Sequence, residues 1–230
     1  MSGAVLRLSV VRDFRAEGWP SMDLCADQLL AHLPAAVPGV KATDVAPDFR
    51  RPLGRLLGRR GFNPDRVLNR HLLLPRVVRQ AARHADFVHV ADHSYAHLTA
   101  AVPPGRAGVY CHDLDAFRCL LEPGQEPRPW WFRRLARRSL DGLRRAAVVF
   151  HNSAAVGHHL RETGIVVPDR LVHAPLGVAA EFTPTAAKPV DVPVSLDPPF
   201  LLHVGGNMPR KRLDVLLDVF AAVRERVPNL

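Results

Sequence analysis

Two short polar segments combine histidine with aspartate in an order suited to proton transfer or to holding a hydroxyl group. Asp92-His93-Ser94 and His112-Asp113 each follow a short apolar run that is typical of a buried strand. A histidine in such a place can bind a hydroxyl or transfer a proton, and a neighbouring carboxylate can orient its ring. The alternative is a packing or surface role, which we expect for most of the 12 histidines of the chain.

A third candidate site is a glycine turn near the C-terminal end of the sequence. The apolar run 200–204 predicts a buried strand, Gly205-Gly206 predicts a turn, and the residues that follow predict an amphipathic helix beginning near position 209. Paired glycines let the backbone approach a ligand, and a helix start that carries Arg210 and Lys211 attracts an anion such as a diphosphate. The alternative is a turn that binds nothing.

The elements that must position these residues alternate between strand and helix. We expect strands over 6–11, 87–90, 108–111, 147–150 and 170–173, and helices capped at Ser21 and over 65–83, 96–102, 128–147 and 154–162. Strand–helix–strand units of this spacing form parallel sheets with right-handed crossovers, whose ligands bind at the carboxyl ends of the strands. The sequence therefore predicts an α/β chain with its polar segments along one edge of the sheet.

Two further residues lie in loops at that predicted edge. Gly18 lies between the first strand and the first helix, where a Rossmann-like half brings its backbone near a ligand, although a simple tight turn is the alternative. Ser153 follows the strand over 147–150. We expect both residues, together with Asp92 and His93, to line a binding cleft.

Composition limits the class of protein. A chain of 230 residues with 47% apolar content can bury a core. No run of about 18 apolar residues occurs, and the N-terminus lacks the pattern of a signal peptide, so we expect a cytoplasmic protein. Cys25, Cys111 and Cys119 lack metal-ligand spacing, so we expect reduced packing residues and no metal site.

The chain is basic, and one predicted helix concentrates that charge. Its 31 Lys and Arg residues exceed its 22 Asp and Glu residues, which gives a net charge of +9 and favours anionic partners. Helix 128–147 begins with Trp130-Trp131 and carries an arginine face, which could lie on an anionic membrane at its inner surface; a docked helix with a solvated face is the alternative. No nucleic-acid motif is found, so no such partner is expected. The arginine face comprises Arg133, Arg134, Arg137, Arg138, Arg144 and Arg145.

Three parts of the sequence are similar to the family-four glycosyltransferases of the GT-B fold. Val204-Gly205 followed by Pro209-Arg210-Lys211 resembles the start of the nucleotide-sugar domain. The segment 110–114, Tyr-Cys-His-Asp-Leu, resembles the strand–His–Asp signature of the N-terminal domain. Residues 175–184, with Pro-Leu-Gly-Val and Phe-Thr-Pro, resemble the end of that domain, so the resemblance extends over essentially the whole chain.

The resemblance implies a reaction and a set of roles. A family member transfers a sugar from a nucleotide diphosphate sugar to an acceptor hydroxyl with retention, without a cofactor or an essential metal. Arg210 and Lys211 would stabilise the departing diphosphate, next to Gly205 and Gly206. His112 and Asp113 would lie beside the transferred sugar. The expected partners are the nucleotide sugar and a glycan, lipid-linked or small-molecule acceptor.

The resemblance also implies a division into domains. We expect a Rossmann-like acceptor-binding domain over 1–185, a linker over 186–199, and the first strand and helix of the nucleotide-sugar domain over 200–230. Because one strand cannot form a sheet, we expect the 230-residue chain alone to be inactive. Two alternatives remain: a non-catalytic glycan- or partner-binding module from a truncated transferase, and a binder of anionic membrane surfaces through the arginine face.

Overall fold

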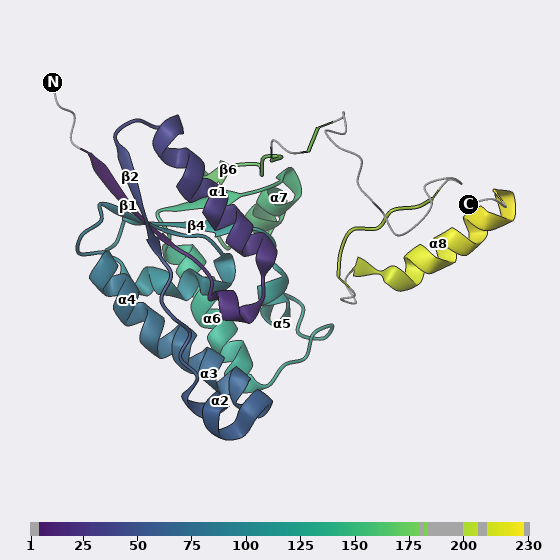
Figure 1. Cartoon of the computed structure of the whole chain (residues 1–230), viewed down its shortest axis with the longest axis horizontal. Coiled ribbons are helices and arrows are strands. Elements are labelled where there is room, and N and C mark those ends of the chain that lie inside the picture. The colour runs from purple at the N-terminus through teal and green to yellow at the C-terminus, as the bar shows by residue number, and fades with distance from the viewer. Residues whose placement is uncertain (1–4, 180–181, 184–199, 207–210, 228–230) are drawn as a thin grey trace. The chain divides into compact units, whose positions relative to one another are not determined.

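The computed structural model describes residues 5–179, 182–183, 200–206 and 211–227 (Figure 1). Contacts within the chain divide it into two units, Met1–Gly177 and Val178–Leu230, which we describe separately. The three cysteines are free, as predicted, with Cys111 and Cys119 buried. None of the helices in these described ranges is long and apolar enough to span a membrane.

The first unit is built on a six-stranded, all-parallel sheet in the order β2-β1-β3-β4-β5-β6. The five strands predicted for this unit all form, to within one residue at their ends. The sixth, β2, was not predicted: it is an edge strand in which only Val45 is buried, so no apolar run marks it. The strands are β1 (Leu6–Val11), β2 (Val40–Val45), β3 (Phe87–Val90), β4 (Ala107–Cys111), β5 (Val148–His151) and β6 (Leu171–His173).

Helices connect these strands. The α-helices of this unit are α1 (Pro20–Ala36), α2 (Pro52–Leu57), α3 (Phe62–Leu68), α4 (Leu74–Ala81), α5 (Arg118–Leu121), α6 (Trp130–Arg145) and α7 (Ala154–Glu162). The remaining helices are the 3-10 helices η1 (Arg15–Glu17), η2 (Gly58–Gly61), η4 (His93–Ala101), η5 (Asp115–Phe117) and η6 (Pro168–Arg170) and the π-helical η3 (Asn69–Leu73). The predicted helix over 96–102 is therefore a 3-10 helix that begins earlier, at His93.

Local sequence explains where two of these helices begin. The prediction that Ser21 caps the first helix is wrong, because α1 starts at Pro20, with Trp19 as the capping residue. Proline suits the first helical position, since its φ is already helical and its missing N–H has no partner to lose there. In contrast, Ser153 does cap α7: its hydroxyl accepts a hydrogen bond from the Val156 N–H at 3.3 Å.

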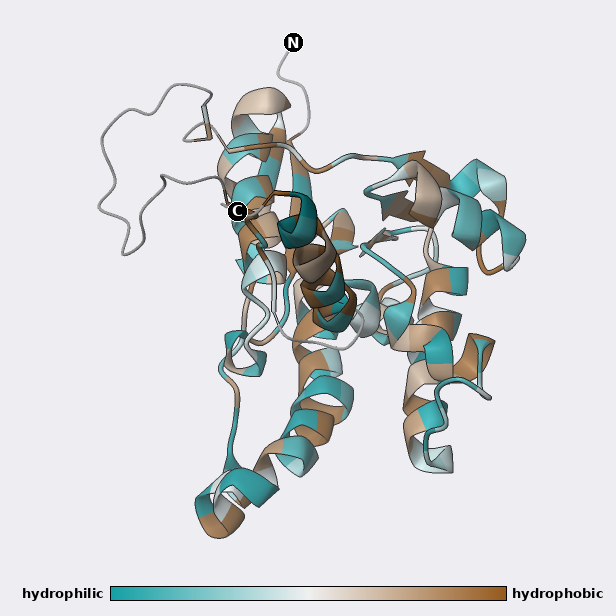
Figure 2. Cartoon of the chain, turned by 90° about the vertical axis from the view of Figure 1, so that its right-hand side faces the viewer, coloured by the Kyte–Doolittle hydropathy of each residue, from teal (hydrophilic) through white to brown (hydrophobic). Residues whose placement is uncertain are grey.

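The core lies between the sheet and the helices α4, η4 and α6, which pack against one another. Hydrophobic and hydrophilic residues alternate along the helices, as expected of helices with one buried face (Figure 2). Gly142 of α6 allows the closest approach, because a Cβ atom at this position would overlap the carbonyl group of Ala96 in η4. Thr99 of η4 donates a hydrogen bond to the Gly142 carbonyl at 3.1 Å. This packing fixes η4, which carries His93 and His97.

The described part of the second unit contains one helix, α8 (Leu213–Arg226). It begins at Leu213, later than the predicted start near position 209, after Arg212 in a left-handed conformation with φ 49°. The predicted strand over 200–204 is not formed. Its side chains are exposed, Val204 to 85%, and the described residues of this unit offer no second strand with which it could form hydrogen bonds.

Candidate functional site

The strand order creates a topological switch point between β1 and β3. The chain passes from β1 to β2 on one side and then returns to place β3 on the other side of β1. Ligands of open parallel sheets bind outside the carboxyl ends of the strands at such a point. Four buried polar residues follow these strand ends within three positions: Arg12 and Asp13 after β1, and Asp92 and His93 after β3.

His93 lies between two carboxylates. Its Nδ1 atom is 3.1 Å from an oxygen of Asp92, and its Nε2 atom is 3.3 Å from an oxygen of Asp113. Burial alone would lower the pKa of His93, but the attraction of Asp92 and the hydrogen bonds with both carboxylates raise the pKa well above 6.5. The charged form of His93 is therefore favoured at neutral pH. Both ring nitrogens have partners, and Nδ1 also lies 3.3 Å from the backbone N–H of His112.

His112 has the opposite electrostatic character. Its Nε2 atom lies 2.9 Å from the Ala91 carbonyl oxygen, which requires the proton to be on Nε2 and leaves Nδ1 as an acceptor. Burial is the main cause that lowers the pKa of His112, so the ring is neutral at neutral pH. The ring centroids of His93 and His112 are 6.3 Å apart. A neutral ring with a free acceptor nitrogen is suited to accepting a hydrogen bond from a hydroxyl group.

Asp13 and Asp92 form a pair of carboxyl groups with different protonation. Burial, and then the charge of Asp92, raise the pKa of Asp13 to about 9, so Asp13 is protonated at neutral pH. For Asp92, the charge of His93 and hydrogen bonds from His93 and Ser94 outweigh burial and hold its pKa below the ordinary value. Neither oxygen of the Asp13 carboxyl group has a hydrogen-bond partner within the described residues. The protonated Asp13 carboxyl group can share its proton with the adjacent Asp92 carboxylate or donate a hydrogen bond to a bound molecule.

A buried ion network lies behind this cluster. The Glu17 side chain is 1% exposed, and its carboxylate accepts hydrogen bonds from Arg70 Nε at 2.7 Å and from the Tyr95 hydroxyl at 2.8 Å. Arg66 Nε lies 2.8 Å from the same carboxylate. Because Tyr95 also accepts a hydrogen bond from the Phe14 N–H at 3.3 Å, the network fixes the loop that follows β1.

The structure brings together four of the predicted site residues: Asp92, His93, His112 and Asp113. Gly18 is exposed and ends η1 with φ 72°, a conformation that favours glycine. The residues that sequence reasoning missed are Asp13, Glu17, Arg70 and Tyr95. Asp13 could have been found, because it follows a predicted strand just as Asp92 does.

The remaining predicted residues are not part of this cluster. The Ser153 hydroxyl caps α7, and no described contact joins it to the histidines. Gly205, Gly206 and Lys211 belong to the second unit, and Arg210 lies outside the described residues. Their role in binding a diphosphate stays a prediction. Within the described ranges, no group of three or more His, Cys, Asp or Glu side chains is arranged to hold a metal ion.

No protein-family model and no curated protein matches the chain. Among solved structures, a crystal structure of LpCGTa in complex with UDP matches 76% of this chain and 54% of its own, with 12% identity and a TM-score of 0.41. Glycyrrhiza uralensis UGT73P12 complexed with glycyrrhetinic acid 3-O-monoglucuronide matches 70% of this chain and 46% of its own, with 12% identity and a TM-score of 0.36. The chain thus spans about half the length of each, and likenesses this distant carry no argument about its function.

Proposed function

We propose that the chain is the acceptor-binding part of a retaining glycosyltransferase of the family-four type, which uses a nucleotide diphosphate sugar as donor. The observation that supports this best is the pairing of neutral His112 with cationic His93 at the switch point of a parallel sheet. Such a site offers a hydroxyl group one acceptor nitrogen and one protonated carboxyl group, that of Asp13. The resemblance of segment 110–114 to the family's strand–His–Asp signature agrees with this assignment.

In this proposal each residue has a defined task. His112 Nδ1 accepts a hydrogen bond from a hydroxyl of the transferred sugar, and His93 and Asp113 hold the loops on either side of it. The bond from the anomeric carbon to the diphosphate oxygen breaks, and the acceptor oxygen bonds to the same face of that carbon. The acceptor proton passes to the leaving diphosphate, whose charge Arg210 and Lys211 stabilise.

The acceptor is proposed to bind in a pocket beside α2 and α3. This pocket has a volume of about 1230 Å³, and its lining includes Phe49, Phe62 and Arg51. The rings of Phe14 and Phe49 are 5.4 Å apart and those of Phe49 and Phe62 are 5.6 Å apart, so an aromatic row leads from the loop after β1 into the pocket. Aromatic faces suit sugar rings or apolar groups, and the arginine favours an acceptor with negative charge.

Saturation-transfer NMR with a panel of alkyl glycosides and oligosaccharides tests the proposed site. We expect transfer to a sugar ligand with the natural chain, loss of that transfer in His112→Ala, and its retention in His159→Ala, whose ring is exposed on α7. Transfer that is unchanged in His112→Ala, or absent for the whole panel, would reject the site. Retention is tested on the glycoside product, through the coupling constant of the new anomeric proton.

Binding to an anionic membrane surface is a second candidate function, and the exposure of α6 favours it. Trp130 is 76% exposed and Trp131 is 49% exposed, next to arginine side chains that point to solvent. We expect vesicles containing phosphatidylglycerol to sediment the chain at low salt, less so at high salt, and less with Trp130→Ser than with the control Trp19→Ser. A chain that stays in the supernatant at low salt contradicts this candidate.

A further inference from the structure

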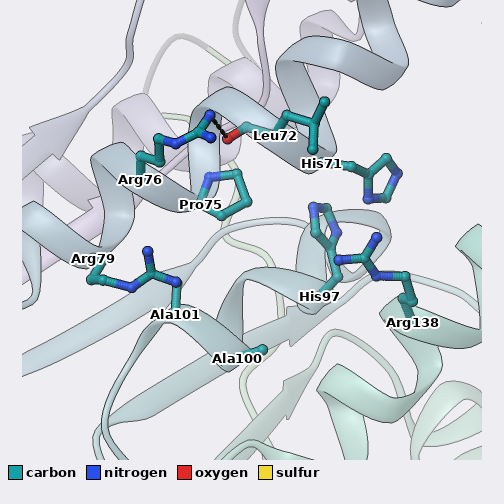
Figure 3. Close-up of a pocket in the computed structure, with 9 residues that line it drawn as sticks. All are labelled: His71, Leu72, Pro75, Arg76, Arg79, His97, Ala100, Ala101 and Arg138. Atoms are coloured by element: carbon teal, nitrogen blue, oxygen red, sulfur yellow. Dashed lines mark hydrogen bonds between the residues drawn. The ribbon is translucent and has the colours of Figure 1, made fainter.

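A second cavity, of about 280 Å³, lies away from the strand ends, between η3, α4, η4 and α6 (Figure 3). Five of its lining residues are basic or can become so: His71, Arg76, Arg79, His97 and Arg138. Figure 3 shows the two histidine rings close together, with the Arg138 guanidinium beside them. The cavity is slightly smaller than the range for ligand pockets, roughly 300–1,000 Å³, and so suits a small ligand.

The positive charge of this cavity is not compensated by the protein. Its lining contains no aspartate or glutamate. Among the described residues, Arg79 and Arg138 form no ion pair, and Arg76 bonds only to the Leu72 carbonyl, at 2.9 Å. Guanidinium groups that line one cavity without a carboxylate attract an anion into it.

The hydrogen bonding of the two histidines also indicates a missing anion. Their ring centroids are 4.3 Å apart. His97 is satisfied, because Nε2 lies 2.9 Å from the Arg70 carbonyl oxygen and Nδ1 lies 3.3 Å from the Ser139 hydroxyl. His71 is not satisfied, because its buried Nδ1 atom has no hydrogen-bond partner among the described residues. The His71 ring lines the cavity, so an anion there would favour its charged form.

Burial and nearby cations lower the pKa values of both rings. Burial, and then the charges of His97, Arg138, Arg70 and Arg66, lower the pKa of His71 to about 3. Burial is also the main cause that lowers the pKa of His97 to about 4. Both rings are therefore neutral at neutral pH while the cavity holds no anion.

We propose that this cavity binds a phosphate group, as a free phosphate monoester or as the phosphate of a lipid headgroup. Arginine suits this ligand, because its planar fork of N–H donors matches two oxygens of one phosphate. In the bound state Arg79 and Arg138 pair with the phosphate oxygens, and the anion favours the charged form of the His71 ring beside it. This site does not depend on the proposed transferase reaction, since none of its residues belongs to the cluster at the strand ends.

The first test is calorimetric titration of the natural chain with inorganic phosphate and with glycerol 3-phosphate. We expect saturable binding that weakens by about 10-fold to 100-fold in Arg138→Gln, since each hydrogen bond to a charged group contributes of that order. Arg79→Gln, at an exposed position, should weaken binding similarly. Arg134→Gln is the matched control, because it lies on the exposed face of α6 but does not line the cavity. An equal effect of Arg134→Gln and Arg138→Gln overturns the proposal.

The second arm distinguishes the two sources of phosphate. Vesicles that contain phosphatidic acid are sedimented with the natural chain and with the same three variants. Binding to vesicles but not to soluble phosphates, lost in Arg138→Gln and kept in Arg134→Gln, assigns the site to a lipid headgroup. Absence of binding in both arms, or vesicle binding that both variants reduce alike, overturns the site.

An NMR titration adds a signature that a structural role would not give. With inorganic sulfate, which stays a dianion throughout the titration, the apparent pKa values of His71 and His97 should rise, because an anion beside the rings favours their charged forms. The resonance of exposed His159 serves as the reference within the same sample. Unchanged titration curves for His71 and His97 at saturating sulfate would also reject the proposal.

Discussion

The guanidinium carbon of Arg70 lies 4.0 Å from the centroid of the Tyr95 ring, and both side chains hold the carboxylate of Glu17. This stacking joins η3 to η4, and the shared contact with Glu17 fixes the loop between β1 and α1. Three parts of the chain that are distant in sequence are therefore tied together at one buried charge. The stability of the site depends on this charge remaining paired.

We expect Arg70→Leu to lower the free energy of unfolding by about 3 kcal/mol or more, because it leaves the nearly inaccessible Glu17 carboxylate with a weaker set of partners. Urea unfolding measures the loss, and Arg76→Leu, which removes an arginine exposed on α4, is the control. In the double variant Arg70→Leu with Glu17→Gln, much of the stability should return. If the double variant is less stable than the single one, the loss comes from packing and not from the unpaired charge.

The pH dependence of stability should report the buried acid Asp13. Its pKa is about 9 in the folded chain and 3.8 in the unfolded chain, so the folded state keeps a proton that the unfolded state releases between these values. The free energy of unfolding therefore falls as pH rises through this window, by at most about 1.4 kcal/mol per pH unit. We expect Asp13→Asn to remove this contribution.

The measurement is urea unfolding of the natural chain and of Asp13→Asn between about pH 5 and about pH 8. The stability of Asp13→Asn relative to the natural chain should increase as pH rises. Other groups contribute equally to both proteins and cancel in the difference. Parallel stability curves would show that Asp13 is ionised in the folded chain.

The sequence was sufficient to predict five of the six strands, because each central strand is a short apolar run buried by helices. It was not sufficient for β2, whose side chains are mostly exposed at the edge of the sheet. Without β2 the switch point between β1 and β3 could not be placed, and Asp13 was overlooked although it follows a predicted strand. The Glu17–Arg70 pair could not be predicted at all, because 53 residues separate its members and charge alone does not reveal burial.

The close packing of α6 on η4 predicts a strong difference between two glycine substitutions. Gly142→Ala would place a methyl group where the Ala96 carbonyl lies, so we expect a loss of about 1–3 kcal/mol in the free energy of unfolding. Gly124→Ala is the matched control, since nothing lies within 4 Å of the added Cβ atom. Thermal unfolding of the two variants measures the difference. Equal melting temperatures would contradict the close approach of the two helices.

The two carboxylates beside His93 should contribute unequally to its charge. Asp92 is the largest of the interactions that raise the pKa of His93, and Asp113 contributes mainly one hydrogen bond. We therefore expect Asp92→Asn to lower the pKa of His93 more than Asp113→Asn does, as measured by NMR titration of the imidazole protons. Asparagine keeps the ability to cap η4 through the Ser94 N–H, so the helix start should persist in both variants.

The same Asp92→Asn variant also tests the carboxyl pair, because the Asp92 charge is one of the causes that raise the pKa of Asp13. Removing that charge should lower the pKa of Asp13 while it lowers the pKa of His93, and Asp113→Asn should leave Asp13 unchanged. Carbon-detected NMR of the Asp13 carboxyl group measures the change in the pKa of Asp13. A variant in which His93 shifts and Asp13 does not would show that burial alone keeps Asp13 protonated, and the paired-carboxyl description of the site would then be wrong.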